Sequence, residues 1–523
     1  MRRLMWIHPL LFAWLAPAAL LSHNIESAPP YTAIRAILAA AGLSLLLLLV
    51  FRALALAWTE AAFLTSMVMM ASSVFGNILQ LIGARPGGPG SIRFHLISLL
   101  VFSGFVGACL WWTRKTHALS PPVHVFLALV GAVMIGTYTV RITAYERLAQ
   151  IPLSLPAMSA ELERYRPTSP PAQTPDIYYV IVDGYGRDDV LREIYRPDNA
   201  EFVQTLKLRG FFVASAGRSN YAQTSLSLAS SMNMSYLDEL QGLKDIGLSQ
   251  SYVTRLFRHN EVMDVLRSYG YAVISIPVTY NRTLLPTADV TYEYSAGPVN
   301  SFESLVLENS IFWSPFILAR GADPSLPFPG YASRRESILA NQAALEDTIL
   351  MSGPKFVFAH LAVPHPPFVF TRTGGPTDAP YPYREQDGDQ FQGSPQEYLT
   401  GYREQVLFAD QLVIAFLDRL EAQGDAGDIV ILQGDHGPGS GLDWLDPART
   451  DMWERLAILN AIRVPGLDDE SFEDTASPVN TFRILFNYLF DASYPRLADK
   501  SYFSSWTSPY SFLSVPESDL RRR

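Results

Sequence analysis

The hydrophobic positions of this 523-residue chain divide it into an apolar first part and a mixed remainder. Five apolar stretches come first, at Leu4–Leu21, Ala33–Trp58, Ala61–Ala84, Phe94–Trp112 and Val123–Val140. Each is close to the length of about 20 residues that a membrane-spanning helix needs. We therefore predict a transmembrane anchor domain of about five spans over residues 1–141. A cleaved signal peptide is the alternative for the first stretch.

A different pattern begins at Asp176, after a juxtamembrane linker of residues 142–175 whose end is rich in proline. From there, short apolar runs typical of buried strands alternate with stretches of helical periodicity. The predicted strands are Ile177–Val182, Phe211–Ala214, Ala272–Ile276, Lys355–Leu361 and Asp428–Leu432. The predicted helices include Asn199–Arg209, Val253–Tyr269, Ser333–Leu350 and Pro395–Ala422. This alternation predicts an α/β domain over residues 176–523, with a mostly parallel sheet covered by helices on both faces.

The charge distribution separates the same two parts of the chain. Residues 1–150 hold 10 Lys and Arg against 3 Asp and Glu, whereas the remainder holds 30 against 47. An acidic outer domain disfavours nucleic acid as a partner. With the amino terminus inside the cell, the basic residues near the spans give a modest positive-inside bias, which places the outer domain beyond the membrane. No predicted span has Asp or Glu near its centre, so an ion-coupled transporter is disfavoured.

Two of the predicted strands end in side chains that bind metal ions. Asp183 follows Ile177–Val182, and Asp435-His436 follow Asp428–Leu432. Because the carboxyl ends of parallel strands meet at one edge of a sheet, we expect these side chains to lie close together. Carboxylate oxygen with imidazole nitrogen suits Zn²⁺, Mn²⁺ or a similar ion. The alternative is that both aspartates only stabilise turns. The single Cys109 leaves no cysteine-based zinc site and no disulfide framework.

A candidate nucleophile lies in the segment that follows Ser219-Asn220. A helix is predicted to begin there, and Thr224, Ser225 and Ser227 all fall near its start. The amino end of a helix stabilises negative charge, and a nearby metal ion would activate a hydroxyl as a nucleophile. Hydroxyl residues at helix starts are also common caps, and their spacing does not choose among the three.

Two histidines flank the end of the predicted strand Lys355–Leu361. His360 shares a strand face with Phe356 and Phe358, so packing in the core is the alternative to a role in catalysis. His365 lies between prolines in the loop that follows, where a plain surface histidine is the alternative. Either imidazole has the chemistry to bind an oxyanion or to protonate a leaving alkoxide.

The order of these residues resembles that of the alkaline phosphatase superfamily, in particular the sulfatase-like branch that contains lipoteichoic acid synthase, other phosphoglycerol transferases and phosphoethanolamine transferases. The resemblance rests on a strand ending in Asp183, a helix start at Thr224, the pair His360 and His365, and then Asp435-His436-Gly437. It implies a metal site made of Asp183, Thr224, Asp435 and His436. It also implies that Thr224 is the nucleophile and that His360 and His365 bind substrate.

Two departures from the family patterns narrow this expectation. The sulfatase signature C/S-x-P-x-R has no match in the sequence, so hydrolysis of sulfate esters is not expected. The additional Asp and His ligands of the two-metal phosphatases also have no match. The resemblance therefore implies one divalent ion, with Mn²⁺ as the first expectation and Zn²⁺, Mg²⁺ or Ca²⁺ as alternatives.

Taken together, the sequence predicts a membrane-anchored transferase or hydrolase of phosphate esters in envelope lipids or glycans, acting through a covalent threonine intermediate. Its partners would be the lipid bilayer and a membrane lipid or lipid-linked glycan. Its location would be the bacterial cytoplasmic membrane, with the catalytic domain in the periplasm or outside the cell. The alternative is a non-catalytic envelope assembly protein with a degenerate domain, against which the four intact candidate ligands count.

Overall fold

The computed structural model describes residues 7–54, 56–81, 91–116, 121–168, 171, 173–196, 199–241, 251–278, 280–292, 299–423 and 427–521. Parts of the first three predicted spans and three residues of the predicted linker lie outside these ranges. The chain folds as two compact units. Unit 1 comprises Met1–Arg147, Gly297–Ser333 and Asp378–Tyr383, and unit 2 comprises Leu148–Ala296, Arg334–Thr377 and Arg384–Arg523.

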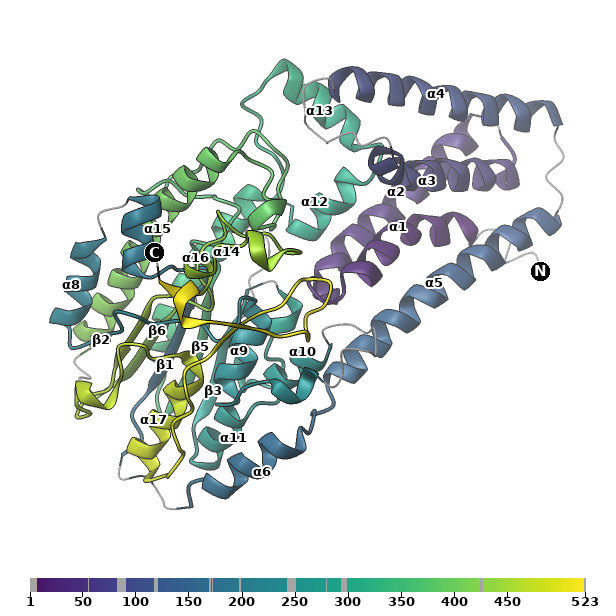
Figure 1. The fold of residues 1–523 in the computed structure, drawn as a ribbon. Coiled ribbons are helices and arrows are strands. Elements are labelled where there is room, and N and C mark those ends of the chain that lie inside the picture. The colour runs from purple at the N-terminus through teal and green to yellow at the C-terminus, as the bar shows by residue number, and fades with distance from the viewer. Residues whose placement is uncertain are drawn as a thin grey trace. The chain divides into compact units, whose positions relative to one another are not determined.

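Helices occupy all five predicted spans in unit 1 (Figure 1). They are α1 (His8–Asn24), α2 (Ile34–Ala53), α3 (Trp58–Leu81), α4 (Ser91–Thr116) and α5 (Pro121–Ala149). Within the described part of the chain, three helical stretches are long and apolar enough to cross a membrane: Pro30–Ala53, Ile92–Lys115 and Pro121–Ala149. Five spans are therefore not confirmed. Helix α1 has 17 residues, which extend about 26 Å and fall short of a hydrocarbon core of about 30 Å. Helix α3 carries Glu60 and several hydroxyl side chains.

Unit 1 also contains a segment from within the range that the sequence assigns to the outer domain. We call Gly297–Ser333 the inserted segment; it includes α12 (Ser301–Glu308), α13 (Trp313–Ala322) and the start of α14 (Tyr331–Thr348). Asn300 begins α12 with a capping box, in which its side chain and that of Glu303 each bond the other's backbone N–H.

Unit 2 is built on a seven-stranded sheet with the strand order β2-β7-β6-β1-β5-β3-β4. The strands are β1 (Ile177–Val182), β2 (Phe212–Val213), β3 (Ala272–Ile276), β4 (Val290–Thr291), β5 (Lys355–Leu361), β6 (Ile429–Gln433) and β7 (Asn460–Arg463). Strands β6, β1, β5, β3 and β4 are parallel, whereas β7 runs antiparallel to β6 and to β2. The sheet is thus mixed, with a parallel centre. A separate antiparallel pair joins β8 (Ser501–Phe503) to β9 (Leu513–Val515).

Helices cover both faces of this sheet (Figure 1). The helices of unit 2 are α6 (Pro156–Tyr165), α7 (Asp188–Val190), α8 (Ala200–Leu208), α9 (Thr224–Met232), α10 (Ser251–Arg258), α11 (Glu261–Ser268), most of α14, α15 (Pro395–Ala422), α16 (Met452–Leu456) and α17 (Pro478–Phe490). Helices α6, α9, α10, α11 and α17 share one hydrophobic core with alternate residues of the strands, such as Tyr179 and Phe358. On the other face, Tyr178 packs against Phe416 of α15 at 5.5 Å between ring centroids. Every residue of β1 is therefore buried, as its continuous apolar run predicts.

One predicted helix is two helices in the structure. The sequence pattern predicts one continuous helix over Val253–Tyr269, but α10 ends at Arg258 and α11 begins at Glu261. Between them, the Asn260 side chain accepts a hydrogen bond from Met263 N at 3.0 Å and so caps the second helix. Asn260 is therefore the cap of a second helix, and the spacing of apolar residues alone did not predict this break.

Candidate functional site

The six residues singled out in the sequence meet in unit 2, at the carboxyl edge of the parallel strands. Strand β1 lies between β5 and β6, with Ile181 paired to His360 on one side and to Gln433 on the other. The segments that follow the ends of β1 and β6 therefore emerge side by side. Two overlapping groups of possible metal ligands result: Asp183 with His365 and His436, and Asp183 with His360 and Asp435.

The distances between these side chains are those of a compact polar cluster. His436 Nε2 lies 3.4 Å from Asp435 Oδ2 and 3.7 Å from Asp183 Oδ1. His360 Nε2 lies 3.2 Å from Asp183 Oδ2. The turn after Asp183 depends on Gly184, whose φ of +75° disfavours other residues and whose N–H donates to Asp435 Oδ1 at 3.0 Å.

A cation fits this cluster because several of its buried atoms lack a hydrogen-bond partner. Asp183 Oδ1, Asp435 Oδ2 and both ring nitrogens of His360 are buried without one. Buried polar groups are normally paired, and a divalent ion would satisfy the carboxylate oxygens and an imidazole nitrogen together. His436 Nδ1 lies 2.9 Å from the Gly437 carbonyl, which can only accept, so Nδ1 carries the proton. Nε2 is then an unprotonated nitrogen that faces the cluster, as a metal ligand must be.

The protonation states of Asp183 and His436 also suit the binding of a divalent cation. Burial alone would raise the pKa of Asp183, but His365, His360 and His436 bring that pKa well below its ordinary value. Burial lowers the pKa of His436, and the Arg455 guanidinium lowers it further. At neutral pH the site therefore holds an ionised Asp183 and a neutral His436, the forms in which both residues bind metals.

Thr224 is the accessible hydroxyl of the three that the sequence left open. It is the first residue of α9, and its Oγ1 lies 3.1 Å from His436 Nε2. Thr224 is partly exposed, whereas Ser225 and Ser227 are buried. Ser227 Oγ is bonded to Ser219 Oγ at 3.1 Å instead. The geometry therefore favours Thr224 among the candidates for a nucleophile.

The two histidines of the 360–365 segment occupy different environments. The His360 side chain is 1% exposed and lies within the ligand cluster, beside Phe358 of the core. The His365 side chain is 16% exposed, and its ring centroid lies 5.9 Å from that of His436. Of these two histidines, only His365 is both accessible to solvent and close to the cluster. His360 has the surroundings of a metal ligand or of a group that orients Asp183.

The sequence did not identify a buried ion pair that supports the site. Asp387 lies in residues 371–396, a segment rich in Gly, Pro, Asp and Gln that is typical of a surface loop, yet this aspartate is buried. Its Oδ2 accepts a hydrogen bond from Arg455 Nη1 at 2.7 Å and lies 4.0 Å from His365 Nε2. Arg455 also donates to the carbonyls of Gly437 and Ala222. One guanidinium thus connects the backbone beside His436, the backbone before Thr224 and the carboxylate that faces His365.

Replacing Asp387 by asparagine is expected to destabilise the protein. The change removes the charge that compensates Arg455, whose side chain is buried beneath Trp444. Breaking one partner of a buried pair costs about 3–5 kcal/mol, because the other charge stays buried. Urea unfolding of the full-length protein in detergent measures the loss. Asp389→Asn, two residues along and exposed, is the control, and an equal effect of both changes would contradict this account.

A second buried acid makes stability depend on pH. Asp410 Oδ1 accepts a hydrogen bond from the hydroxyl of Tyr185 at 2.5 Å. Burial raises the pKa of Asp410 to about 7, although the bond from Tyr185 opposes the shift. Because the folded pKa exceeds the unfolded value of about 3.9, stability falls as the pH rises between those values. Asp410→Asn should therefore raise the melting temperature at about pH 8 and leave it nearly unchanged at about pH 4. The same change at both pH values would show that Asp410 does not titrate in this way.

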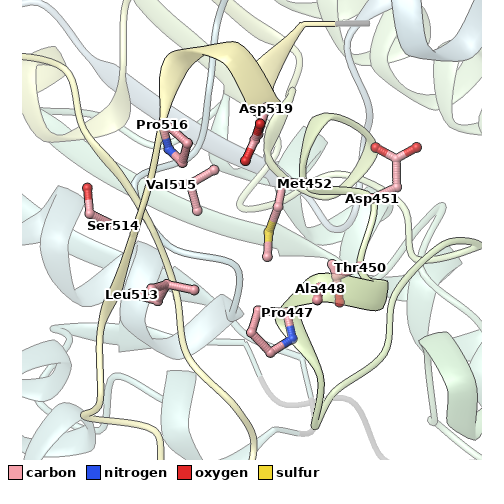
Figure 2. Close-up of a pocket in the computed structure, with 10 residues that line it drawn as sticks. All are labelled: Pro447, Ala448, Thr450, Asp451, Met452, Leu513, Ser514, Val515, Pro516 and Asp519. Atoms are coloured by element: carbon pink, nitrogen blue, oxygen red, sulfur yellow. The ribbon is translucent and has the colours of Figure 1, made fainter. Parts of the chain in front are cut away.

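A separate surface pocket of about 480 Å³ lies between residues 447–452 and 513–519 (Figure 2). Met452, Leu513 and Val515 give it apolar walls, and Asp451 and Asp519 add carboxylates. None of the six candidate site residues lines this pocket. It is therefore distinct from the cluster at the strand ends.

Comparison of the sequence with protein families gives one match. The profile of the family named Sulfatase matches residues 175–465, which is more than half of the chain. The match begins just before β1 and ends just after β7, so it includes every residue of the cluster. No curated protein sequence matches the chain.

Solved structures that match this chain include a periplasmic domain, an integral membrane transferase and a hydrolase. The C-terminal periplasmic domain of EptC from Escherichia coli, in complex with zinc, is 12% identical with a TM-score of 0.43, over 67% of this chain and 95% of that one. The integral membrane lipooligosaccharide phosphoethanolamine transferase A from Neisseria meningitidis is 14% identical with a TM-score of 0.41, over 92% and 80%. The phosphonate monoester hydrolase of Agrobacterium radiobacter is 14% identical with a TM-score of 0.40, over 63% and 80%.

Proposed function

Because the chain belongs to the sulfatase family, we propose that it is a membrane-anchored, metal-dependent enzyme that transfers or hydrolyses phosphate esters of envelope lipids or glycans. One observation carries the proposal. The accessible Oγ1 of Thr224 lies 3.1 Å from His436 Nε2, beside a buried cluster of carboxylates and imidazoles. A hydroxyl at a helix start, next to a cation site, is suited to attack on phosphorus and to binding of the phosphoryl oxygens.

In the proposed reaction, Thr224 would react as the alkoxide, its hydroxyl proton having passed to solvent before the donor is attacked, and its Oγ1 attacks the phosphorus of a donor ester. The Oγ1–P bond forms while the bond from phosphorus to the leaving alkoxide breaks, and the alkoxide takes a proton from His365. An acceptor hydroxyl, or water, then gives a proton back to His365 and attacks the phosphothreonine; the new O–P bond forms while the Oγ1–P bond breaks, and Thr224 returns to its alkoxide form. The amino end of α9 favours the negative charge on the phosphoryl oxygens in both steps.

Asp183, Thr224, Asp435 and His436 would hold one divalent cation, for which Mn²⁺ stays our prediction and Zn²⁺, Mg²⁺ or Ca²⁺ the alternatives. When bound, such an ion lowers the pKa of the hydroxyl it ligates and neutralises phosphoryl charge. In this scheme His360 supports Asp183 from within the cluster, at 3.2 Å. His365, the accessible histidine, contacts the substrate.

We further propose that the protein lies in the bacterial cytoplasmic membrane, with unit 2 in the periplasm or outside the cell. The three apolar helical stretches of unit 1 support the membrane placement. A site on that side of the bilayer would meet membrane lipids and lipid-linked glycans. The acidic composition of the chain after residue 150 gives no reason to expect a nucleic-acid partner.

The full-length protein in vesicles of phosphatidylglycerol and phosphatidylethanolamine, each with a labelled headgroup, tests this function. With Mn²⁺ present, we expect one of the two lipids to lose its phosphorylated headgroup and leave diacylglycerol. Label recovered on an added hydroxyl acceptor would identify a transferase, and label released as the free headgroup phosphate would identify a hydrolase. Loss of neither lipid, in a preparation with stoichiometric metal, would contradict the proposed substrate class.

A further inference from the structure

The inserted segment, Gly297–Ser333, is attached to the helices of unit 1 along its length. Four contacts join it to α3, to α4, to the start of α2 and to Thr32 just before α2. These contacts are the ion pair of Glu303 with Arg35 at 2.6 Å, Asn300 Nδ2 to Thr32 O at 3.0 Å, Ile311 N to Ser72 O at 3.3 Å, and Ser314 Oγ with His95 Nδ1 at 2.8 Å. Helix α13 packs against the first part of α4 (Figure 1). At Gly321, an added Cβ would come within 2.8 Å of Ile92 of α4, so the two helices are closely packed.

The turn between α12 and α13 reaches well along α4. Ile311, in this turn, is 3% exposed and packs against Phe94, Leu99 and Phe102. Phe102 lies about 16 Å along the helix axis from Ser91, at 1.5 Å per residue. These positions belong to the apolar stretch Ile92–Lys115, which is long enough to cross a membrane. The turn is therefore beside residues that would lie at the depth of the hydrocarbon.

The amino-acid composition of the turn is suited to the hydrocarbon region of a bilayer. The ten residues Ser310–Ala319 include no charged side chain. Apolar runs of about 10–14 residues are typical of buried helices and of segments that enter a membrane without crossing it. Backbone groups at bilayer depth must be bonded within the protein, and Ile311 N–H donates to the Ser72 carbonyl of α3. The first charged side chain beyond this run is that of Arg320, which stacks over Phe328 at 3.9 Å.

We propose that α12 and α13 form a re-entrant hairpin whose turn enters the bilayer beside α4 and contacts lipid through Phe312. Both ends of the inserted segment continue into residues of unit 2, so the hairpin would enter and leave the membrane on one and the same side. Phe312 is 39% exposed between the buried Ile311 and Trp313, so its ring is the part of the turn that a lipid chain can cover. The inference rests on the proposed membrane placement of α4. It means that residues within the sequence range of the outer domain, and not only the predicted spans, face lipid.

Quenching by lipid tests the hairpin directly. Phe312→Cys is made in the full-length protein on a Cys109→Ala background, labelled with bimane and placed in vesicles with and without brominated phosphatidylcholine. Leu100→Cys on α4, at a position 72% exposed, is the matched control for contact with lipid. Leu208→Cys on α8 of unit 2, at a position 77% exposed, is the matched control for contact with water.

We expect brominated lipid to quench the label at Phe312 to an extent comparable with Leu100, and to leave the label at Leu208 unchanged. Quenching at Leu100 without quenching at Phe312 would overturn the hairpin and leave the membrane placement of α4 intact. Absence of quenching at Leu100 would overturn the membrane placement, and the hairpin with it. Neither result bears on whether unit 2 is catalytic, which the headgroup assay decides separately.

Discussion

Thr224→Ala should abolish turnover, with a loss of at least about 10³-fold in kcat and little change in folding. The reason is that the accessible hydroxyl next to His436 disappears while the helix start remains. Alanine leaves Gln223 as the residue before α9 and removes only one methyl and one hydroxyl from a partly exposed position. Release of diacylglycerol from labelled phospholipid, measured per mole of folded enzyme, is the readout.

Two matched variants make this result specific. Thr224→Ser keeps a hydroxyl at the same position and should retain measurable activity. Ser227→Ala removes a buried hydroxyl one turn along, whose bond is to Ser219 and not to the cluster, and should leave kcat within a few-fold of the wild type. Full activity in Thr224→Ala would exclude the threonine as nucleophile. A comparable loss in Ser227→Ala alone would move that role to the serine.

Asp435→Asn should remove both metal and activity. Asparagine can still accept the hydrogen bond from Gly184 N through its Oδ1, but it presents a neutral group where the partnerless Oδ2 stands now. The proposed cation site has two carboxylates, and loss of one charge would weaken it, so we expect metal content near zero and turnover reduced by at least about 10²-fold. Metal analysis of the purified protein and the headgroup assay measure the two effects.

The control for this change is an aspartate outside the cluster. Asp410→Asn removes a buried carboxylate that bonds Tyr185, and it should leave the metal content unchanged. If Asp435→Asn retained stoichiometric metal and activity, the cluster would not be the metal site. If the wild-type protein itself bound no metal and turned over no ester, the non-catalytic alternative would replace the enzyme.

The parts of the fold that depend on local sequence were predictable. Strand β1 has the bounds that its continuous apolar run predicts, and α15 begins where Ser394 and Glu397 form a capping box. The parts that depend on distant contacts were not. Strand β7 is short, and its antiparallel pairing with β6 leaves no local signal. The inserted segment has an ordinary helical pattern, and its contacts with other helices of unit 1, which include α2, α3 and α4, assign it to that unit.

In the candidate site, too, some residues have a local signal in the sequence and others depend on distant contacts. Asp183, Asp435 and His436 could be found because each follows a strand, and strand ends share an edge. Asp387 could not, because its surroundings in the sequence are those of a polar loop and its partner Arg455 lies in a distant short helix. The choice among Thr224, Ser225 and Ser227 also needed the structure, since it depends on exposure and not on spacing. The functional roles of these residues stay predictions that the experiments above test.

The central claim is a covalent intermediate on Thr224, and peptide mass spectrometry over Asn220–Met234 tests it most directly. The full-length protein would be purified from its own membranes with Mn²⁺ present, so that its natural donor lipid has been available. We predict a mass adduct on Thr224 whose size identifies the group transferred, such as phosphate, phosphoglycerol or phosphoethanolamine. An adduct on a different residue, or an unmodified Thr224 in metal-loaded enzyme trapped during measured turnover, would contradict the account.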